Sequence, residues 1–217
     1  MTGSKGERSA GVREPRVGIL CLQGDYEAHA RVLERLGVAW RDIRRPEELT
    51  GLDGLVLPGG ESTTMWHFLR QDGFAEALQE LGRSGAAIFG TCAGAILLAR
   101  EVRNPDGLGL GLLDAVLERN SYGRQVESSV RRAALEDVAG LGNGSRPGDP
   151  IEAVLIRAPR ILDLGRGVRV RARLDGDPVW VEEGAIQATT FHPELGPEER
   201  PHRRFMELAA AAAARRS

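Results

Sequence analysis

The most constraining feature of the sequence is a cysteine in a glycine-flanked corner, GTCAG at residues 90–94. The apolar residues 86–89 precede this corner and predict a short buried strand, whereas residues 95–99 follow it and predict a helix. Glycines on both sides are typical of a strained strand-to-helix turn that exposes a nucleophile. The dipole of the helix also favours a thiolate at its N-terminus. A buried structural cysteine needs no such corner, so we interpret Cys92 as a candidate nucleophile.

A second motif, FHPE at residues 191–194, follows a hundred residues after the cysteine. In an extended chain, residues two apart point to the same side and lie roughly 6.5–7 Å apart. We therefore expect His192 and Glu194 to share a face, with Pro193 stiffening the turn. A carboxylate placed there orients one imidazole nitrogen and leaves the other to take a proton from the thiol. The alternative is a chance cysteine and a chance His-Pro-Glu.

The composition is that of an ordinary globular protein and narrows the classes of function. The 217 residues are 41% hydrophobic and 28% charged, which is enough for one α/β domain with a substantial core. A net charge of −2 gives no electrostatic argument for nucleic-acid binding, and no apolar run approaches the ~18 residues of a membrane span. Four histidines without a CxxC or HExxH pattern predict neither a metal site nor a cofactor.

The chain contains two cysteines, Cys21 and Cys92. This number excludes a disulfide framework and makes the cytoplasm the default location. Cys21 lies within an apolar run at residues 17–22, so we interpret it as a buried strand residue. Residues 1–16 contain basic side chains without an apolar core segment, and we expect a disordered tail rather than a signal peptide. Residues 17–217 are expected to form a single domain.

The order of the predicted elements indicates an α/β fold. The first half of the domain predicts strands at 17–22, 38–43, 54–57 and 86–89, helices at 27–36, 63–69 and 74–81, and a short helix or turn at 46–52. Such alternation favours a doubly wound, mostly parallel central sheet flanked by helices.

The second half of the chain predicts an antiparallel extension of that sheet and a final helix. The expected strands are 112–119, 153–156, 168–174, 179–183 and 185–191, with a looser alternation at 126–135. Residues 139–150 are rich in turn-forming residues and predict a mobile surface loop. The alanine-rich residues 203–214 predict a terminal helix.

Several other residues are candidates for a site, each with a structural alternative. The turn at residues 58–62 (PGGES) follows the carboxyl end of a strand, where ligands bind in open α/β sheets. Its backbone N–H groups could form an oxyanion hole. Alternatively, it is a simple tight turn in which Ser62 caps the start of a helix. The Gln23-Gly24 corner should face the same edge of the sheet, or simply close the first strand. Arg119 and Arg157 each end an apolar strand, and without further context we expect them in solvent.

The remaining histidines carry no comparable signal. His29 and His67 lie in predicted helices and are interpreted as structural or surface residues. His202 stands at the start of the terminal helix, where we expect it on a solvated face.

Taken together, the motifs resemble one family. They are LQGDYEAH (22–29), LPGGESTTM (57–65), GTCAG (90–94), ERNSYGRQVES (118–128), IRAP (156–159) and FHPEL (191–195). The combination is similar to the glutaminase subunits of pyridoxal 5′-phosphate synthase, within the triad (class I) glutamine amidotransferases of flavodoxin-like fold. GTCAG and HPE indicate only the superfamily, whereas ERNSYGRQ and PGGESTTM indicate the family. The longer tail and the loop at 139–150 depart from the family pattern, and neither affects the triad.

The resemblance implies a role for each matching residue. Cys92 would be the nucleophile that forms a γ-glutamyl thioester with glutamine, His192 the base and acid, and Glu194 its orienting group. The implied oxyanion hole consists of Gly59, Gly60 and Ala93. The implied glutamine-binding residues are Gly60, Glu61, Ser62, Arg119, Ile156 and Arg157. On this reading both arginines bind ligand instead of facing solvent.

The resemblance also implies a partner. Members of the family supply ammonia to a (β/α)₈-barrel synthase subunit in a large hetero-oligomer, and docking completes their active site. The isolated chain should then be weakly active, and Gln23-Gly24 is a candidate part of the interface. Three alternatives stay open: a glutaminase feeding another acceptor, such as the histidine-pathway enzyme, a non-catalytic scaffold on the same fold, and a free-standing γ-glutamyl hydrolase.

Overall fold

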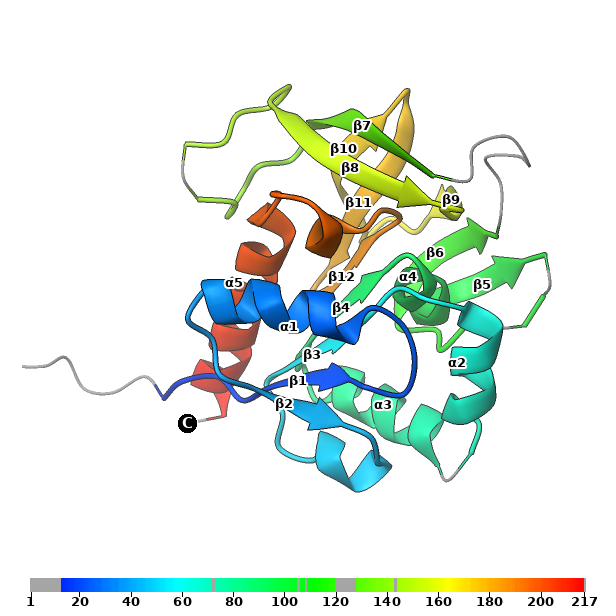
Figure 1. Cartoon of the computed structure of the whole chain (residues 1–217), viewed down its shortest axis with the longest axis vertical. Coiled ribbons are helices and arrows are strands. Elements are labelled where there is room, and N and C mark those ends of the chain that lie inside the picture. Colours follow the sequence, from blue (N-terminus) through cyan, green and yellow to red (C-terminus); the bar gives the residue numbers. More distant parts are fainter. Residues whose placement is uncertain are drawn as a thin grey trace, which may run out of the picture.

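A computed structural model describes residues 13–216, except 72, 105, 108, 120–127 and 143. Two sheets dominate it: one has nine strands in the order β2-β1-β3-β4-β12-β11-β10-β7-β8, and the other has three in the order β5-β6-β9. Helices flank the first part of the large sheet, and the antiparallel strands stand above it (Figure 1). The chain therefore has the predicted α/β fold, with a mostly parallel core and an antiparallel extension.

Five strands form the parallel part of the large sheet. In spatial order they are β2 (Trp40–Ile43), β1 (Val17–Leu20), β3 (Gly54–Leu57), β4 (Ala87–Thr91) and β12 (Ile186–Thr189). All residues of the four inner strands are buried, which explains why their sequences are apolar runs without alternation. β2 lies at the edge and is partly exposed.

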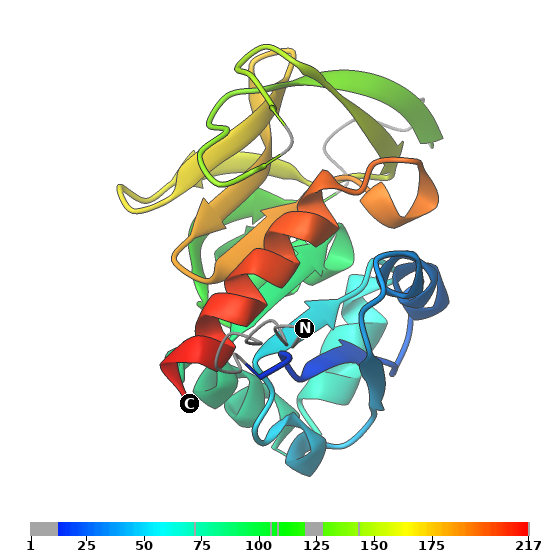
Figure 2. The same cartoon turned by 90° about the vertical axis from the view of Figure 1, so that its left-hand side faces the viewer.

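Helices cover both faces of these strands. On one face, α1 (Tyr26–Arg35) and α5 (Arg200–Arg215) pack on side chains such as Ile19, Val56 and Phe89. Figure 2 shows α5 running in front of the strands. On the other face, α2 (Ser62–Leu69), α3 (Phe74–Arg83) and α4 (Ala93–Leu98) pack with the strand residues that point the opposite way. The 3₁₀ helix η1 (Pro46–Leu49) also lies on this face, through Leu49. Because helices cover both faces of the sheet, a ligand can reach the strands at their carboxyl ends.

The rest of the large sheet is antiparallel. β11 (Asp177–Glu183) pairs with β12, and β10 (Arg169–Leu174), β7 (Ser128–Leu135) and β8 (Pro150–Ile156) follow in spatial order. The small sheet contains β5 (Ala99–Arg103), β6 (Leu113–Glu118) and β9 (Arg160–Leu164). Trp180 and Phe191 are fully buried in a separate core under the extension.

The structure corrects parts of the sequence interpretation. The segment 185–191 was expected to be antiparallel, but its strand β12 ends at Thr189 and is antiparallel only to β11, while it is parallel to β4. Strands β5 and β9 were not predicted. Their sequences, AREVR and RILDL, are short and bear charges because each lies at an edge of the small sheet. The mobility of the 139–150 loop stays a prediction.

The last residues of the predicted tail contact the domain. The Arg13 guanidinium forms a bidentate ion pair with the buried Asp53 carboxylate, at 2.6 and 2.9 Å. The backbone N–H of Arg16 donates to the same carboxylate. Burial would raise the pKa of Asp53, but these donors hold it below its ordinary value. Residues 13–16 thus belong with the domain, whereas residues 1–12 lie outside the described part of the chain.

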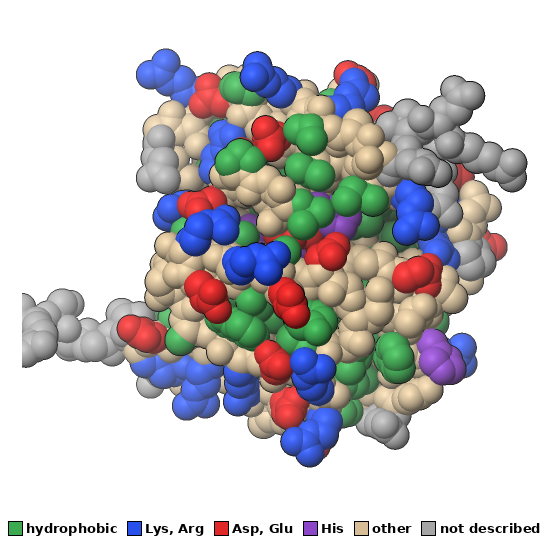
Figure 3. All heavy atoms as spheres, in the orientation of Figure 1, with side chains coloured by type: hydrophobic (Ala, Val, Ile, Leu, Met, Phe, Trp, Pro, Cys, Tyr) green, Lys and Arg blue, Asp and Glu red, His purple; other side chains and the backbone are tan. Residues whose placement is uncertain are grey.

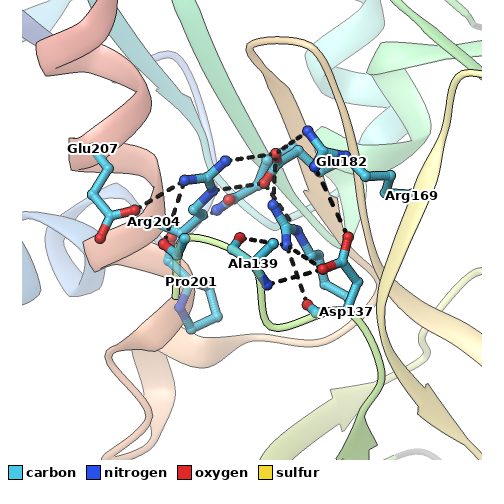
Figure 4. Close-up of polar contacts among 10 residues, drawn as sticks. Asp137, Ala139, Arg169, Glu182, Pro201, Arg204 and Glu207 are labelled. Carbon is cyan, nitrogen blue, oxygen red and sulfur yellow. Dashed lines mark hydrogen bonds and ion pairs between the residues drawn. The ribbon is translucent and has the colours of Figure 1, made fainter. Parts of the chain in front are cut away.

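A buried ionic network joins the antiparallel extension to α5 (Figure 4). The Glu182 carboxylate accepts bidentate bonds from Arg171, at 2.8 and 3.1 Å, and from Arg204, at 2.8 Å for both. Arg171 also donates to the carbonyls of Asp137 and Ala139 at the start of the 139–150 loop. Arg171 and Glu182 are fully buried. The network therefore holds β10, β11, α5 and the loop in one arrangement.

We predict that Arg171→Met lowers the free energy of unfolding by about 3 kcal/mol, because it removes one partner of a buried, hydrogen-bonded charge. Chemical denaturation measures the effect. Arg173→Met is the matched control, since it is the same substitution on the same strand and its ion pair with Glu136 is exposed; it should change stability by less than about 1 kcal/mol. Equal effects of the two substitutions would contradict the assigned role of the network.

Candidate active site

Cys92 stands in a strained corner between β4 and α4. Its φ of 47° lies in a region that non-glycine residues seldom adopt. A Cβ at Gly94 would come within 2.1 Å of the Leu57 carbonyl oxygen, and one at Gly90 within 2.6 Å of the Gly94 backbone. The flanking glycines are therefore required by close contacts with β3 and within the turn itself. The corner has the geometry of a nucleophile elbow.

His192 and Glu194 are in direct contact, but not through an extended chain as predicted. Pro193 begins the 3₁₀ helix η2 (Pro193–Leu195), and this tight turn brings Glu194 Oε1 to 2.7 Å from His192 Nδ1. The reason is that β12 has already ended and the backbone N–H of His192 donates to the Val154 carbonyl of β8, at 2.8 Å. A carboxylate can only accept, so the proton lies on Nδ1, and Nε2 is the ring nitrogen available to Cys92.

The electrostatics of the site favour a charged imidazole at His192, beside Cys92. Burial alone would lower the pKa of His192, but the hydrogen bonds with Cys92 and Glu194 and the Glu194 charge raise it well above its ordinary value. Burial would raise the pKa of Glu194, yet the adjacent histidines, His29 and His192, hold it far below its usual range. Glu194 therefore stays ionised at neutral pH although it is buried.

One cavity, of about 250 Å³, contains most of the predicted site residues. It is smaller than the roughly 300–1,000 Å³ of pockets for drug-sized ligands, which suits a molecule the size of an amino acid. The predicted residues that line it are Gly60, Glu61, Ser62, Cys92, Ala93, Arg119, Ile156, Arg157 and His192. Gly59 and Glu194 are not among the lining residues, but both contact His192. A Cβ at Gly59 would approach the imidazole to 2.2 Å, and Glu194 contacts Nδ1.

Two lining residues were not predicted. Ile96 lies on α4, one turn after the cysteine corner, and Asp25 precedes α1. The Asp25 carboxylate lies 3.9 Å from His192 Nδ1. The sequence contains no signal that would identify Ile96 as a site residue, because an apolar residue in a buried helix normally belongs to the core. Asp25, in contrast, was already part of the LQGDYEAH motif.

The two arginines lie at the cavity and not merely in solvent. Arg119 is paired with Glu61, at 3.2 Å, and donates to the Thr63 hydroxyl, at 3.0 Å. Burial would raise the pKa of Glu61, but Thr64, which donates twice to its carboxylate, and Arg119 keep it below its ordinary value. Arg157 has a φ of 43°, so two strained non-glycine residues, Cys92 and Arg157, share one small cavity.

The glycine turn and the Gln23-Gly24 corner pack on each other, as expected for one edge of the sheet. The Gln23 side chain accepts from the Glu61 N–H, at 3.0 Å, and the Asp25 N–H donates to the Gly59 carbonyl, at 3.0 Å. Glu61, rather than Ser62, caps α2. Ala93 is the first residue of α4, so its N–H has no acceptor within the helix, and Ala93 lines the cavity.

One histidine was misplaced by the sequence interpretation: His202 was expected on a solvated face but is fully buried. His29, interpreted as a structural or surface residue, is also fully buried. Both follow a helical signal that marks buried positions: His29 is spaced by four from Leu33, and His202 by three from Phe205. His67, in contrast, is exposed on α2. The segment 120–127, with most of the ERNSYGRQVES motif and Tyr122, lies outside the described residues.

Comparison with known proteins agrees with this geometry. Residues 19–210 match the model of the SNO glutamine amidotransferase family. The chain belongs to this family. It is 47% identical to the pyridoxal 5′-phosphate synthase subunit PdxT of Thermus thermophilus over 195 residues, which cover 89% of this chain and 97% of the relative. It is 46% identical to PdxT of Koribacter versatilis over 193 residues, 89% of this chain and 95% of the relative.

A solved structure gives the same result for the fold. A crystal structure described as a glutamine amidotransferase is 45% identical, has a TM-score of 0.80, and covers 89% of this chain and 98% of its own. The unmatched part of the chain includes the N-terminal residues before 19, in agreement with the tail that departs from the family pattern. As a member of the SNO family, the chain is a glutamine amidotransferase whose cavity contains a cysteine, a histidine and paired charges.

Close packing of the Gly59 backbone on His192 generates a prediction. In Gly59→Ala the new methyl group would overlap the imidazole, which must move away from Cys92 or from Glu194. We expect kcat for glutamine hydrolysis to fall about 100-fold, the cost of a misplacement near 1 Å. Gly167→Ala is the control, because Gly167, like Gly59, has no positive φ and a Cβ there would first meet the end of the flexible Glu183 side chain, at 3.2 Å; it should leave kcat unchanged. Unchanged kcat in Gly59→Ala would show that this contact does not position the imidazole.

Proposed function

We propose that this chain hydrolyses L-glutamine to L-glutamate and ammonia, and supplies the ammonia to a synthase subunit for pyridoxal 5′-phosphate (vitamin B6) synthesis. The observation that carries the proposal is Cys92 in its strained corner, lining the same cavity as a His192 that Glu194 holds by a 2.7 Å hydrogen bond. The family and the PdxT relatives support this reading. The chemistry also requires such a site, because an amide is a poor electrophile.

In the first half of the reaction, the Cys92 thiolate attacks the side-chain amide carbon of glutamine. A tetrahedral intermediate forms, and its negatively charged oxygen is stabilised by N–H groups of Ala93 and of the Gly59-Gly60 turn. The imidazolium of His192 then protonates the amide nitrogen, the carbon–nitrogen bond breaks, and ammonia leaves. The products of this half are ammonia and a γ-glutamyl thioester on Cys92.

In the second half, a water molecule attacks the thioester. The neutral His192 takes one proton from this water, and the hydroxide adds to the carbonyl carbon. When the carbon–sulfur bond breaks, glutamate is released and the thiolate–imidazolium pair is restored. Glu194 stays ionised throughout and stabilises the imidazolium in both halves.

The charges around the cavity suit the backbone end of glutamine. Arg119 and Arg157 supply cations for the α-carboxylate, and Glu61 supplies an anion for the α-ammonium group. Gly60, Ser62 and Ile156 complete the walls. This assignment explains why Arg119 and Glu61 are already paired at 3.2 Å: each neutralises the other until the substrate arrives.

A partner subunit is needed because free ammonia is mostly protonated at neutral pH and escapes into solvent. We infer that the partner is a (β/α)₈-barrel synthase in a large hetero-oligomer, with Gln23-Gly24 in the interface. Leu195, which follows the orienting Glu194, is 43% exposed and provides apolar surface beside the site. In this proposal, docking at the Gln23-Gly24 corner sets the glycine turn through the Gln23 and Asp25 contacts.

The proposed setting is the cytoplasm, without nucleic acid or membrane. Basic and acidic side chains are interspersed over the face in Figure 3, so no single-sign field covers it. Among the described residues, no helix combines the length and the apolar character needed to span a membrane. The active site as proposed uses no metal and no cofactor.

The direct test is glutamate release from glutamine, with and without the cognate synthase. We expect strong stimulation by the synthase and a loss of activity to background in Cys92→Ala. Cys21→Ala is the matched control, because Cys21 is buried away from the cavity and burial raises the pKa of its thiol to about 11; it should retain activity.

Other outcomes separate the alternatives. Full activity without any partner would indicate a γ-glutamyl hydrolase, and stimulation only by a different synthase would indicate another amidotransferase. Activity that survives in Cys92→Ala would remove Cys92 as the nucleophile. Absence of hydrolysis under all conditions would indicate a non-catalytic scaffold.

A further inference from the structure

His29 of α1 contacts both catalytic segments and is not among the residues that line the cavity. Its Nε2 lies 3.4 Å from Glu194 Oε1 and 3.1 Å from the hydroxyl of Thr91, the residue before Cys92. Its Nδ1 lies 2.9 Å from Nε2 of His202, on α5. All three side chains, His29, Glu194 and His202, are fully buried. A line of contacts thus runs from α5 through α1 to the orienting carboxylate.

The contacts are consistent with one arrangement of protons. Burial lowers the pKa of His202 to about 3, so His202 is neutral and carries a single N–H. Among the described residues, His202 Nδ1 has no hydrogen-bond partner, which a lone pair tolerates better than an N–H does. The His202 proton therefore lies on Nε2 and is donated to His29 Nδ1. His29 then carries its own proton on Nε2, directed toward Glu194 and Thr91.

His29 is a second donor within reach of the Glu194 carboxylate, on the same oxygen that His192 contacts. Glu194 Oε1 already accepts from His192, and among the described residues Glu194 Oε2 has no partner. A buried carboxylate is costly unless donors compensate its lost hydration. The other titratable groups near these residues are Cys92 and His192 in the cavity, Asp25 at the start of α1, and Arg35, whose charge disfavours a protonated His202.

On the basis of the proposed glutaminase function, we propose that His29 is a positioning residue of the reaction. It donates its Nε2–H to Glu194 Oε1, and His202 fixes the tautomer that makes this possible. The three-residue site thereby extends into a buried line, His202–His29–Glu194–His192–Cys92. A histidine that merely filled the core would have no need to contact both the orienting carboxylate and the residue before the nucleophile. Phe89, which packs against both rings, fills that role.

The test compares His29→Met, which fills similar space without a donor, with His29→Gln, whose amide keeps a donor at a similar reach. Each is made alone and together with Glu194→Gln, and hydrolysis is measured with the synthase present. We expect His29→Met to lower kcat roughly 10- to 100-fold, the effect of one hydrogen bond to a charged group, with KM for glutamine unchanged because His29 does not line the cavity. His29→Gln should recover most of the loss.

The double variant separates positioning from a structural role. If His29 acts through Glu194, His29→Met costs nothing further in the Glu194→Gln background. An equal loss in both backgrounds, or a change in KM alone, would overturn the proposal. His67→Met, on an exposed position of α2, is the control and should have no effect. If His29→Met does not fold, His202→Leu removes the tautomer-fixing donor and should give a smaller kcat loss; full activity in that variant would overturn the assigned tautomer.

A second readout does not depend on glutamine hydrolysis. The rate at which iodoacetamide alkylates Cys92, followed against pH by peptide mass spectrometry, reports the thiolate–imidazolium pair. Its midpoint should move to higher pH in His29→Met, in the same direction as in Glu194→Gln, and return in His29→Gln. An unmoved midpoint in His29→Met would contradict the proposal. If the wild type does not hydrolyse glutamine, the proposed function fails, while this profile still decides whether His29 positions the pair.

Discussion

The site depends on the pairing of β4 with β3 on one side and β12 on the other. The parallel register places Gly90 beside Leu57 and Thr91 beside Thr189, so three strands end at the same level. The glycine turn, the cysteine corner and the histidine turn each begin where one of these strands stops. Parallel strands buried on both faces cannot shift without exposing their apolar side chains. The large core therefore fixes the relative positions of a nucleophile and a base that lie a hundred residues apart.

The local strain of the site is maintained by that same packing. Cys92 and Arg157 both have positive φ values, and neither is a glycine. Such conformations persist only where the surroundings determine them, and they concentrate at functional sites. At Cys92 the surroundings are the glycine contacts with Leu57 and within the turn, which leave the chain no room to relax. The strained corner presents the thiol at the start of α4, toward His192.

Much of the fold was predictable because its signals are local. The buried strands are continuous apolar runs, and the helices between them have apolar residues at helical spacing. The edge strands β5 and β9 were missed because an exposed edge has no such pattern. The extended geometry predicted for His192 and Glu194 was wrong. The contact depends on where β12 ends and on a backbone hydrogen bond to β8, and both are set by tertiary structure rather than by the local sequence.

The sequence also identified the residues of the cavity more reliably than their surroundings. Motifs contain the groups that perform the chemistry, so Cys92, His192 and the glycine turn were predicted directly. The arginines could be assigned to the site only through family resemblance, because a charged residue at the end of a strand does not show whether its side chain points to solvent or to a ligand. His29 and His202 looked ordinary, since what distinguishes them is a contact between α1 and α5 that no local pattern records.

The central claim is that Cys92 forms a covalent γ-glutamyl intermediate. The most direct measurement is mass spectrometry of the chain after rapid acid quenching during turnover of glutamine with the synthase present. We expect a species heavier by one glutamyl group, with the added mass on the peptide that contains Cys92. Turnover that proceeds without any such species in the wild type, or with the added mass on another residue, would contradict this claim.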